Sequence, residues 1–581
     1  MVTTVNIALH LTQMATSHPA QLAVMVPLGR CSNGERNYAS YTYQQLDEQS
    51  DLLAAGLDAN GIGRGVRTVL MVPPSLEFFS LTFALFKLGA VPVFVDPGMG
   101  IKNLGRCLAE ADPAAFIGVT KAQIARVLFG WGKLSLSRVV TVGRRLGWGG
   151  LNLAAIQQAG QIRQSEITNR ELRWSAPATT RDETAAILFT SGSTGVPKGA
   201  VYSHGNFAAQ VEALRQTFHI EPGEIDLCTF PLFALFAPAL GMTAIIPRMD
   251  FTKPARVNPQ EIAEPILRFG INNLFGSPAL LNRVGREVQA IESRTVSFAP
   301  TLANDLLPPW TSVRRILSAG APVSPMILER FSRRIPQDVQ IFTPYGATES
   351  LPVAVIGSHE ILQETRHLTA RGAGTCVGRP VAGVEVEIIE ITDTPITRWD
   401  EKLCKPQGEV GEIVVRGPMV TQEYFRRPDL TALAKILDPT TGQMLHRMGD
   451  LGYFDQQGRL WFCGRKSHRV VTPEQTYFTE QVEGIFNTHP AVFRTALVGV
   501  ARDGQVQPLL CVERESRRSL PAAHPITDAN LIIELLEIGS AFELTRAIKT
   551  MVFHPRFPVD IRHNSKIFRE KLAVWGAARF K

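Results

Sequence analysis

A glycine-rich segment that directly follows an apolar run constrains this chain more than any other feature. Residues 185–189 read Ala-Ala-Ile-Leu-Phe, and residues 190–199 continue as Thr-Ser-Gly-Ser-Thr-Gly-Val-Pro-Lys-Gly. Glycine lets a backbone turn and approach a ligand closely, hydroxyls and free amides bind phosphate oxygens, and Lys198 adds a positive charge. The segment therefore predicts a phosphate-binding loop after a buried strand, in an enzyme that uses ATP. Its predicted nucleotide ligands are Thr190, Ser191, Gly192, Ser193, Thr194 and Lys198.

The spacing of this loop is not that of the Walker A motif, in which lysine directly follows glycine and precedes Ser or Thr. Here Val196 and Pro197 separate Gly195 from Lys198, and Gly199 comes next. A flexible Ser/Gly linker is the competing interpretation. We favour the phosphate loop because linkers are rarely preceded by the pattern of a buried strand.

Composition and charge narrow the class of protein. The 581 residues are 45% apolar, which is typical of a soluble globular chain with large cores. The net charge is +7, but basic residues neither form a run of five nor interleave with aromatic residues, so nucleic-acid binding is not predicted. Peripheral contact with an anionic membrane stays open. The seven cysteines include no CxxC pair, which favours reduced thiols in the cytoplasm over a disulfide framework or a zinc site.

One charge-free stretch, Leu227 to Pro247, is long enough to span a bilayer. It contains Pro231 and Pro238 as well as Pro247, and a span there would split an α/β pattern in two. We interpret it as buried core that lines a pocket, so no transmembrane segment is predicted. The N-terminus has no basic region before its first apolar residues, and a signal peptide is not expected either.

Strand and helix patterns alternate along most of the chain. Thr68 to Val72 is typical of a buried strand, Leu76 to Leu88 of a helix with an apolar face, and Val91 to Val95 of the next strand. Alternation of this kind predicts an α/β fold with parallel sheets covered by helices. The same order returns at Val313 to Leu317, Met326 to Arg334 and Val339 to Phe342.

Two helices between these units have recognisable ends. Asn206 is predicted to cap a helix that runs to about Phe218. Pro259 is predicted to open another helix, which ends near Gly270 and is followed by a short strand from Leu274.

The pattern changes twice toward the C-terminus. From Gly383, Val384, Val386 and Ile388 alternate with acidic residues, which predicts an antiparallel, half-exposed sheet or a small β-barrel. After Gly464 a mixed pattern resumes and predicts a small α+β domain. We therefore expect an N-terminal domain over residues 1–464, which contains the predicted ATP-binding loop, and a C-terminal domain over residues 465–581.

A run of small residues, Ser318 to Pro322, follows one of the predicted strands. Gly320 and Ala321 at its centre would leave a flat backbone shelf on which a purine can lie. Further on, Gly449 precedes Asp450, whose carboxylate would accept hydrogen bonds from ribose hydroxyls. Taken alone, Asp450 is equally typical of a turn.

The segment Tyr345 to Glu349 follows the predicted strand that ends at Phe342. It offers an aromatic face at Tyr345, a close-approach glycine at Gly346, the hydroxyl of Thr348 and the carboxylate of Glu349. Magnesium takes only one or two carboxylates from a protein and the rest of its ligands from phosphates and water, so Glu349 is a candidate Mg²⁺ ligand. A core tyrosine and a solvated loop acid are the plainer alternatives.

With these motifs in this order, the chain resembles the adenylate-forming superfamily of acyl-CoA synthetases, luciferases and peptide-synthetase adenylation domains. The resemblance implies a mobile C-terminal domain hinged after Arg465, a residue that would also contact the nucleotide. It implies that a substrate carboxylate attacks the α-phosphate of ATP, giving acyl-AMP and pyrophosphate, with Mg²⁺ as cofactor. Lys566 would balance charge in that step, beside Thr348 and Glu349. The matching segments are residues 190–199, 231–233, 318–322, 345–349, 408–417, 449–451, 464–465 and 564–567.

Three positions depart from the pattern of superfamily members that transfer the acyl group to coenzyme A. Ala234 stands where those members usually carry histidine, Ser467 where they carry a hinge acid, and Glu474 near a usual glycine. A Pro-Glu pair at 473–474 does not readily provide the close approach that glycine allows. Transfer to a thiol is therefore not predicted, although neutral drift in a working CoA ligase is the alternative.

These departures, together with residues 231–238, 345–352 and 563–570, resemble the bacterial olefin-biosynthesis β-lactone synthetases. The resemblance implies a long-chain 2-alkyl-3-hydroxy fatty acid as substrate, whose β-hydroxyl attacks its own adenylated carbonyl and expels AMP. Other enzymes of the hydrocarbon pathway would then be partners. A long-chain fatty acyl-CoA ligase or a fatty acyl-AMP ligase would share the first step. The histidines near these motifs are interpreted as structural and no base is assigned: His204, His446, His468 and His563.

Overall fold

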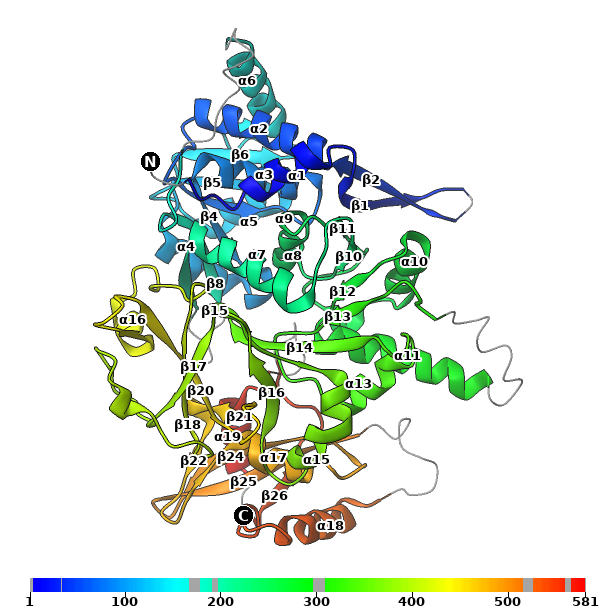
Figure 1. Cartoon of the computed structure of the whole chain (residues 1–581), viewed down its shortest axis with the longest axis vertical. Coiled ribbons are helices and arrows are strands. Elements are labelled where there is room, and N and C mark those ends of the chain that lie inside the picture. Colours follow the sequence, from blue (N-terminus) through cyan, green and yellow to red (C-terminus); the bar gives the residue numbers. More distant parts are fainter. Residues whose placement is uncertain are drawn as a thin grey trace.

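The computed structural model describes residues 4–32, 34–166, 178–190, 197–295, 309–515, 526–559 and 566–579. Over these residues the chain is a mixed α/β protein, which confirms the predicted class. Figure 1 shows two large sheets in the upper and middle parts of the molecule and a small group of strands and helices at the lower end.

The upper sheet has seven strands in the order β7-β6-β5-β3-β4-β8-β9. Neighbouring strands pair in parallel except β8 and β9, which form an antiparallel hairpin. Helices cover both faces, since Phe116 packs with α4 in one apolar core while the next residue, Ile117, packs with α2 and α3 in another. The strands are β3 Arg67–Met71, β4 Val91–Val95, β5 Ala115–Val119, β6 Arg138–Val142, β7 Leu151–Asn152, β8 Thr184–Thr190 and β9 Lys198–Ser203. The helices are α1 Leu9–Ser17, α2 Tyr43–Ala59, α3 Leu76–Leu88, α4 Ile101–Ala111, α5 Thr120–Phe129 and α6 Leu153–Glu166.

The larger sheet follows the path β17-β18-β20-β21-β16-β15-β14-β13-β12-β10-β11-β1-β2, with β19 added beside β20. Its central strands, from β14 through β11 to β1, pair in parallel, whereas the pairs from β14 to β17 are antiparallel. The antiparallel strands predicted after Gly383 therefore join the parallel region in one continuous hydrogen-bonded sheet. The strands are β1 Leu22–Arg30, β2 Arg36–Thr42, β10 Ile225–Cys228, β11 Thr243–Ile245, β12 Asn273–Phe275, β13 Arg315–Leu317, β14 Gln340–Ala347, β15 Ser350–Gly357, β16 Thr375–Pro380, β17 Glu385–Ile389, β18 Gly411–Arg416, β19 Lys435–Leu437, β20 Met444–Phe454 and β21 Leu460–Arg465. The helices connected with this sheet are α7 His204–Phe218, α8 Pro231–Ala234, α9 Phe236–Ala239, α10 Gln260–Phe269, α11 Pro278–Thr295, α13 Pro325–Ser332, α14 Ser358–Glu360, α15 Arg366–Thr369 and α16 Pro428–Ala434.

Two details of this region correct the sequence predictions. The cap of α7 is Ser203 rather than Asn206: the Ser203 hydroxyl accepts from the Asn206 amide at 3.1 Å, and the Asn206 side chain accepts from the Ser203 amide at 3.0 Å. The strand predicted to end at Phe342 continues to Ala347, because β15 pairs with it and satisfies its backbone groups, with Tyr345 opposite Ala354.

The stretch Leu227 to Pro247 folds into β10, α8, α9 and β11 and belongs to the interior, as predicted. Leu240 and Ile245 are almost fully buried, while the neighbouring aromatic residues face a cavity described below. In the part of the chain that the structure describes, no helix is both long and apolar enough to cross a membrane.

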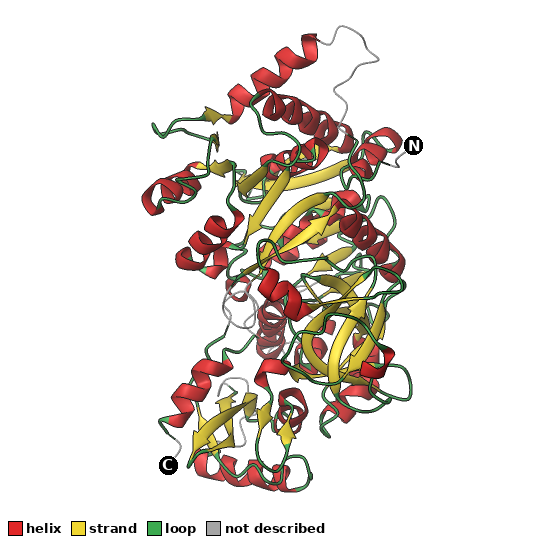
Figure 2. Ribbon diagram, turned by 90° about the vertical axis from the view of Figure 1, so that its left-hand side faces the viewer, coloured by secondary structure: helices red, strands yellow, loops and turns green. Residues whose placement is uncertain are grey.

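The chain after β21 forms a small α+β unit, seen at the lower end of Figure 2 near the C-terminus. A two-stranded hairpin precedes a sheet in which β24 pairs antiparallel with β25, and β25 pairs in parallel with β26. Thr375 on β16 donates to Glu480 on α17 at 2.9 Å, and Arg286 on α11 lies 3.2 Å from Glu515. These contacts tie the unit to the larger sheet. Its elements are β22 Val470–Val471, β23 Thr476–Tyr477, α17 Thr479–Phe486, β24 Val492–Arg502, β25 Gln505–Arg514, α18 Asp528–Ser540, β26 Met551–Phe553 and α19 Arg569–Ala577.

Candidate active site

The predicted phosphate loop connects the two strands of the β8-β9 hairpin, in which Thr190 lies opposite Lys198. The strand before the loop is therefore present, as its apolar sequence predicts. Ser191, Gly192, Ser193 and Thr194 fall outside the described residues, as does the side chain of Thr190. Lys198, at the start of β9, is described in full.

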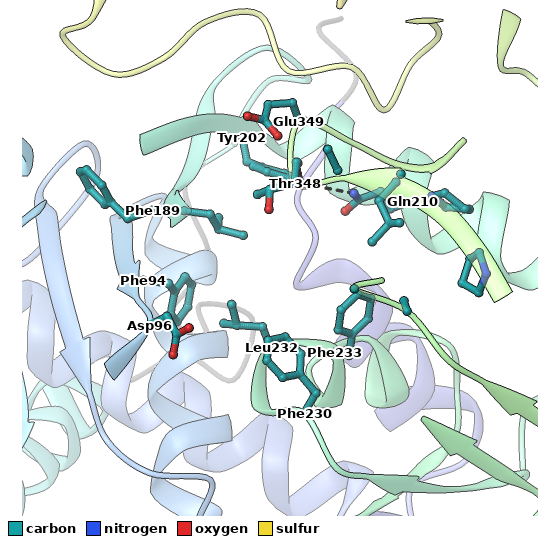
Figure 3. Close-up of a pocket in the computed structure, with 18 of the residues that line it drawn as sticks. Phe94, Asp96, Phe189, Tyr202, Gln210, Phe230, Leu232, Phe233, Thr348 and Glu349 are labelled. Carbon is teal, nitrogen blue, oxygen red and sulfur yellow. Dashed lines mark hydrogen bonds between the residues drawn. The ribbon is translucent and has the colours of Figure 1, made fainter. Parts of the chain in front are cut away.

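A cavity of about 520 Å³ lies beside this hairpin, between the two large sheets. Figure 3 shows Tyr202, Thr348 and Glu349 along one side of the cavity and Phe230, Leu232 and Phe233 along the opposite side. One end is polar and the other aromatic, so a single space can hold an ionic group and an apolar chain together. The polar and charged lining residues include Asp96, Lys198, Thr229, Ser277, Thr348, Glu349, Glu412, His446, Arg447, Arg465, Lys466 and Lys566. The aromatic lining includes Phe83, Phe86, Phe94, Phe189, Phe207, Phe230, Phe233, Phe236, Phe251 and Phe275.

The buried carboxylate of Glu349 forms an ion pair with the half-buried Lys198 at the polar end. Its Oε1 atom lies 3.0 Å from Lys198 Nζ and accepts a hydrogen bond from the Tyr424 hydroxyl at 2.5 Å. Burial alone would raise the pKa of the carboxyl, but the Lys198 charge, together with the Tyr424 hydrogen bond, outweighs it and holds the pKa well below its usual range. Glu349 is therefore ionised, and because both contacts go to Oε1, Oε2 is the oxygen left for a ligand.

Two further ionisable groups stand next to this pair. Lys435 is almost completely buried, donates to the backbone carbonyl and hydroxyl of Thr421, and has its pKa lowered by burial to about 7. His446 lines the cavity, and its Nδ1 lies 3.2 Å from the carbonyl of Ala434. Burial and the charge of Lys435 lower the pKa of this imidazole well below its ordinary value, so the ring is neutral. A carbonyl only accepts hydrogen bonds, so Nδ1 carries the ring proton.

The backbone of Thr348 is fixed from the strand β9 and the helix α7. The hydroxyl of Tyr202 donates to the carbonyl of Thr348, and Gln210 donates to that hydroxyl at 3.3 Å. Figure 3 shows these side chains together at the cavity wall. The turn between β14 and β15 of the larger sheet, which presents Thr348 and Glu349, is thus held by a side chain of the upper sheet and a side chain of the helix that follows it.

Asp450 and Tyr345 form a second polar cluster with Arg465. Burial raises the pKa of Tyr345, so its hydroxyl stays protonated and donates to Asp450 Oδ2 at 2.8 Å. Arg465 Nη1 lies 3.0 Å from Asp450 Oδ1 but directs its hydrogen bond to the carbonyl of Met448 at 3.1 Å. Oδ1 is therefore a buried acceptor without a hydrogen-bond donor among the described residues, which suits a hydroxyl of a bound ligand.

The predicted purine shelf lies at the end of β13. Gly320 has a φ of +99° and lines the cavity together with Ala319, while Gly346 on β14 lines it as well. A side chain at Gly346 would meet the Ser350 carbonyl at 2.7 Å, so glycine is required there by packing. Ala321 is half-buried beside Gly320.

Lys566 reaches this cavity from the C-terminal unit. It lines the same space as Lys198 and Glu349, and its charge contributes to lowering the pKa of Asp450, against the larger effect of burial. The residue just before it, Ser565, lies outside the described chain. A lysine 368 positions beyond Lys198 is therefore brought to the predicted nucleotide site, where a surface lysine was the alternative.

The aromatic end is built largely by the two short helices α8 and α9. The rings of Phe233 and Phe275 stack with centroids 4.3 Å apart, and Phe230 and Phe236 lie beside Phe233. Ala234, between the lining residues, is completely buried and points into the core. Position 234 therefore presents no polar side chain to the cavity.

Comparison with known proteins agrees with this geometry. Residues 11–425 match the family model described as AMP-binding enzyme. The chain belongs to the AMP-binding enzyme family. It is 48% identical to an olefin β-lactone synthetase of Xanthomonas campestris pv. campestris, over 99% of this chain and 98% of the relative. It is 49% identical to an olefin β-lactone synthetase of Stenotrophomonas maltophilia, over 99% of both chains. Among solved structures, the amide bond synthetase McbA of Marinactinospora thermotolerans shares the fold with a TM-score of 0.74 and 22% identity, over 98% of this chain and 99% of that one.

The described part of this AMP-binding enzyme contains no group of three or more His, Cys, Asp or Glu side chains that could hold a metal by themselves. Glu349 nevertheless fits a magnesium ion. The carboxylate is ionised, and its Oε2 is not used in the contacts with Lys198 and Tyr424. A hard cation that also binds phosphate oxygens and water needs no more than this from the protein.

Several residues around the site of this AMP-binding enzyme were not predicted from the sequence. Tyr424 is 75 positions from its partner Glu349, and Lys435 follows a segment without any recognisable motif. His446, which the sequence leaves as a structural histidine, also lines the cavity. Lys198 is the one sequence feature that indicates such partners. A lysine in a partly buried loop needs a counter-charge and hydrogen-bond acceptors around it, but the sequence does not say which residues provide them.

Proposed function

We propose that this AMP-binding enzyme converts a long-chain 2-alkyl-3-hydroxy fatty acid into a β-lactone at the expense of ATP. In the first step the carboxylate attacks the α-phosphate, forming acyl-AMP and releasing pyrophosphate. In the second step the β-hydroxyl oxygen attacks the adenylated carbonyl. The new C–O bond closes a four-membered ring, the bond to AMP breaks, and the hydroxyl proton is released.

The observation that carries the proposal is that a single cavity contains both the aromatic end and the charged residues Lys198, Glu349 and Lys566. A fatty acid with its chains among the phenylalanines would place its carboxylate at the charged end. Holding the β-hydroxyl next to the activated carbonyl supplies a high effective concentration, which offsets part of the ring strain. The two relatives at 48% and 49% identity, both olefin β-lactone synthetases, support the same reaction.

Each part of ATP has a matching part of the site in this proposal. The loop at 190–196 and Lys198 would hold the phosphates, and the backbone at Gly320, Ala321 and Gly346 would lie along the purine. Asp450 Oδ1, which is ion-paired with Arg465 but receives no hydrogen bond from the described residues, would accept one from a ribose hydroxyl next to Tyr345. Family membership as an AMP-binding enzyme supports a nucleotide in this place.

Lys566 would place its charge between the substrate carboxylate and the α-phosphate as negative charge develops there. Thr348 would donate to the same phosphate from the turn fixed by Tyr202. Glu349 would hold Mg²⁺ through Oε2, and the ion would bridge to the phosphates and offset their charge. The contacts of Lys198 with Glu349 would then be shared with the nucleotide.

Coenzyme A has no evident role in this reaction. Ala234 is buried apolar core, and Glu474 is exposed in the hairpin between β22 and β23. Neither residue offers what a thiol-transferring relative has at these positions. An acyl-CoA ligase or acyl-AMP ligase is the alternative, and it requires an external acceptor.

We also propose that residues 465–581 form a lid that carries Lys566 into the site and moves at Arg465, and that the enzyme works in the reducing cytoplasm. All seven cysteines are free, and five are buried. Enzymes that supply the hydroxy acid or consume the lactone would be functional partners.

The substrate assignment is tested by pyrophosphate release. The enzyme should release pyrophosphate rapidly with a long-chain 2-alkyl-3-hydroxy acid. Its rate with acetate or a short 3-hydroxy acid should be much lower, because these acids leave the aromatic end of the cavity empty. Replacing Phe233 by Asp should abolish release with the long acid. Equal rates for long and short acids, or an unaffected Phe233→Asp variant, would remove the fatty acid from this cavity.

A further inference from the structure

Helix α5 carries an apolar face that points to solvent. Its inner side packs on the upper sheet, where the buried side chain of Gln123 donates to the carbonyl of Val140 at 3.0 Å. On the outer side Leu128 is 73% exposed, and Val127 and Phe129 are about half exposed. Surface helices ordinarily place polar residues on this side, so four apolar positions there, including Ile124, need an explanation.

The two loops at the ends of α5 extend this face. Leu134, in the loop after the helix, is completely exposed, and Phe129 stacks on Trp131 with ring centroids 5.6 Å apart, which fixes the start of that loop. At the other end the hydroxyl of Thr120 donates to the carbonyl of Arg144 at 2.7 Å and holds the loop after β6 against the helix. The α5 patch is defined by Ile124, Val127, Leu128, Phe129, Leu134 and Leu146.

The segment of chain that carries the α5 patch has charges of one sign only. Residues 113–165 contain seven Lys and Arg and no Asp or Glu, while the whole chain has a net charge of +7. Lys121 and Arg144 are exposed at one end of the helix, and Lys133 is exposed at the other. The patch therefore combines protruding apolar side chains with cations on both flanks.

We infer that the α5 patch docks the enzyme on the surface of an anionic phospholipid bilayer. Leucine and phenylalanine side chains at a helix surface can enter the boundary between headgroups and acyl chains, while lysine and arginine bind the lipid phosphates. Lys121 and Lys133 flank an apolar centre, and no acid lies within residues 113–165. This arrangement matches the order of layers in an anionic bilayer, in which lipid phosphates lie above an apolar boundary.

This inference does not depend on the proposed reaction, although it gives that reaction a source of substrate. A long-chain acid resides in bilayers, and an enzyme that stays on the membrane surface meets it there. The docking is peripheral, since the described helices include none that could span the bilayer.

The test is co-sedimentation of the full chain with vesicles of phosphatidylcholine alone and of phosphatidylcholine mixed with phosphatidylglycerol. We expect binding to the anionic vesicles, weakened by salt, and little binding to the neutral ones.

Leu128→Ser with Leu134→Ser should weaken binding about tenfold or more, because each loses most of its apolar surface. Lys121→Glu with Lys133→Glu should weaken it by a similar factor. Val574→Ser, at a site 76% exposed on α19, is the matched control and should bind like the unaltered enzyme.

Thermal unfolding at the same temperature as the unaltered enzyme shows that each variant is folded. The inference is wrong if the unaltered enzyme ignores anionic vesicles, if it binds neutral vesicles equally, or if the control loses as much binding as the two double variants. It is also wrong if the double variants still bind vesicles but differ from the unaltered enzyme in oligomeric state, measured as the particle mass by light scattering. That result would make the α5 patch an interface between protein chains.

Discussion

The carboxylate of Glu349 lies 3.0 Å from the ammonium group of Lys198, so the predicted metal ligand and the predicted phosphate-binding lysine are direct partners. Tyr424 completes the contact through its hydroxyl, which accepts from Lys198 and donates to Glu349. A buried charge that loses its partner is costly, and the charge of Lys198 is what keeps the pKa of the buried Glu349 carboxyl below its ordinary value. In the proposed function, nucleotide binding would exchange these contacts for contacts with phosphate and Mg²⁺.

Lys566→Ala should slow acyl-AMP formation by about 10²- to 10³-fold, because one positive charge is lost where negative charge develops. ATP binding should remain largely intact, since Asp450, Lys198 and the phosphate loop are unchanged. The measurement is pyrophosphate release in a single turnover. Lys571→Ala, on the exposed part of α19, is the control and should behave like the unaltered enzyme. A Lys566 variant with the rate of that control would contradict the assigned role.

Glu349→Gln should raise the Mg²⁺ concentration required for half-maximal activity, because a neutral amide is a poorer ligand for a hard cation. The change is measured by titrating MgCl₂ at saturating ATP. Glu409→Gln, in an exposed position beside Lys405, serves as control. An unchanged titration would take Glu349 out of the metal site.

Asp450→Asn should weaken ATP binding by about 10- to 100-fold, the usual effect of losing a hydrogen bond to a charged acceptor. The specific test uses ATP and 2′,3′-dideoxy-ATP with both enzymes. The unaltered enzyme should discriminate strongly against the dideoxy nucleotide, and the variant should discriminate little. If the variant discriminated against the dideoxy nucleotide as strongly as the unaltered enzyme does, the effects of the mutation and of the missing hydroxyls would be independent. Asp450 would then not contact the ribose.

Lys435 predicts a particular dependence of stability on pH. Burial lowers its pKa from 10.5 to about 7, so between these values the unfolded chain binds a proton that the folded chain does not. The free energy of unfolding should therefore rise with pH in this window, by at most about 1.4 kcal/mol per pH unit. Lys435→Met, which keeps the volume and removes the charge, should lack this rise. The comparison is made by thermal unfolding of both proteins from pH 7 to pH 10, and parallel curves would contradict a neutralised lysine.

Local patterns predicted the elements that local forces determine. The helix α3 begins at Leu76 and ends at Leu88 as predicted, because Ser75 caps it and Gly89 adopts the left-handed conformation after it. The cap of α7 was misplaced because Ser203 and Asn206 are both good cap residues. Which of them begins the helix is decided by where the strand β9 ends.

The polar end of the cavity shows what sequence patterns do not contain. Glu349, Lys198 and Lys566 belong to recognisable motifs, and the structure brings all three to one cavity. Tyr424 and Lys435 belong to no motif, and only the pairing of distant strands places them beside Glu349. The exposed face of α5 was missed for a different reason, since an apolar helix pattern is ordinarily assigned to the core.

The central claim is that the acyl-AMP is consumed by the substrate's own hydroxyl. The most direct test identifies the products by mass spectrometry after incubation with ATP, Mg²⁺ and a 2-alkyl-3-hydroxy acid, with and without coenzyme A. The account predicts complete conversion to β-lactone and AMP without coenzyme A, whereas the 3-deoxy acid should stop at bound acyl-AMP with one pyrophosphate per active site. Acyl-CoA as the main product, or repeated turnover of the 3-deoxy acid into a thioester, would contradict it.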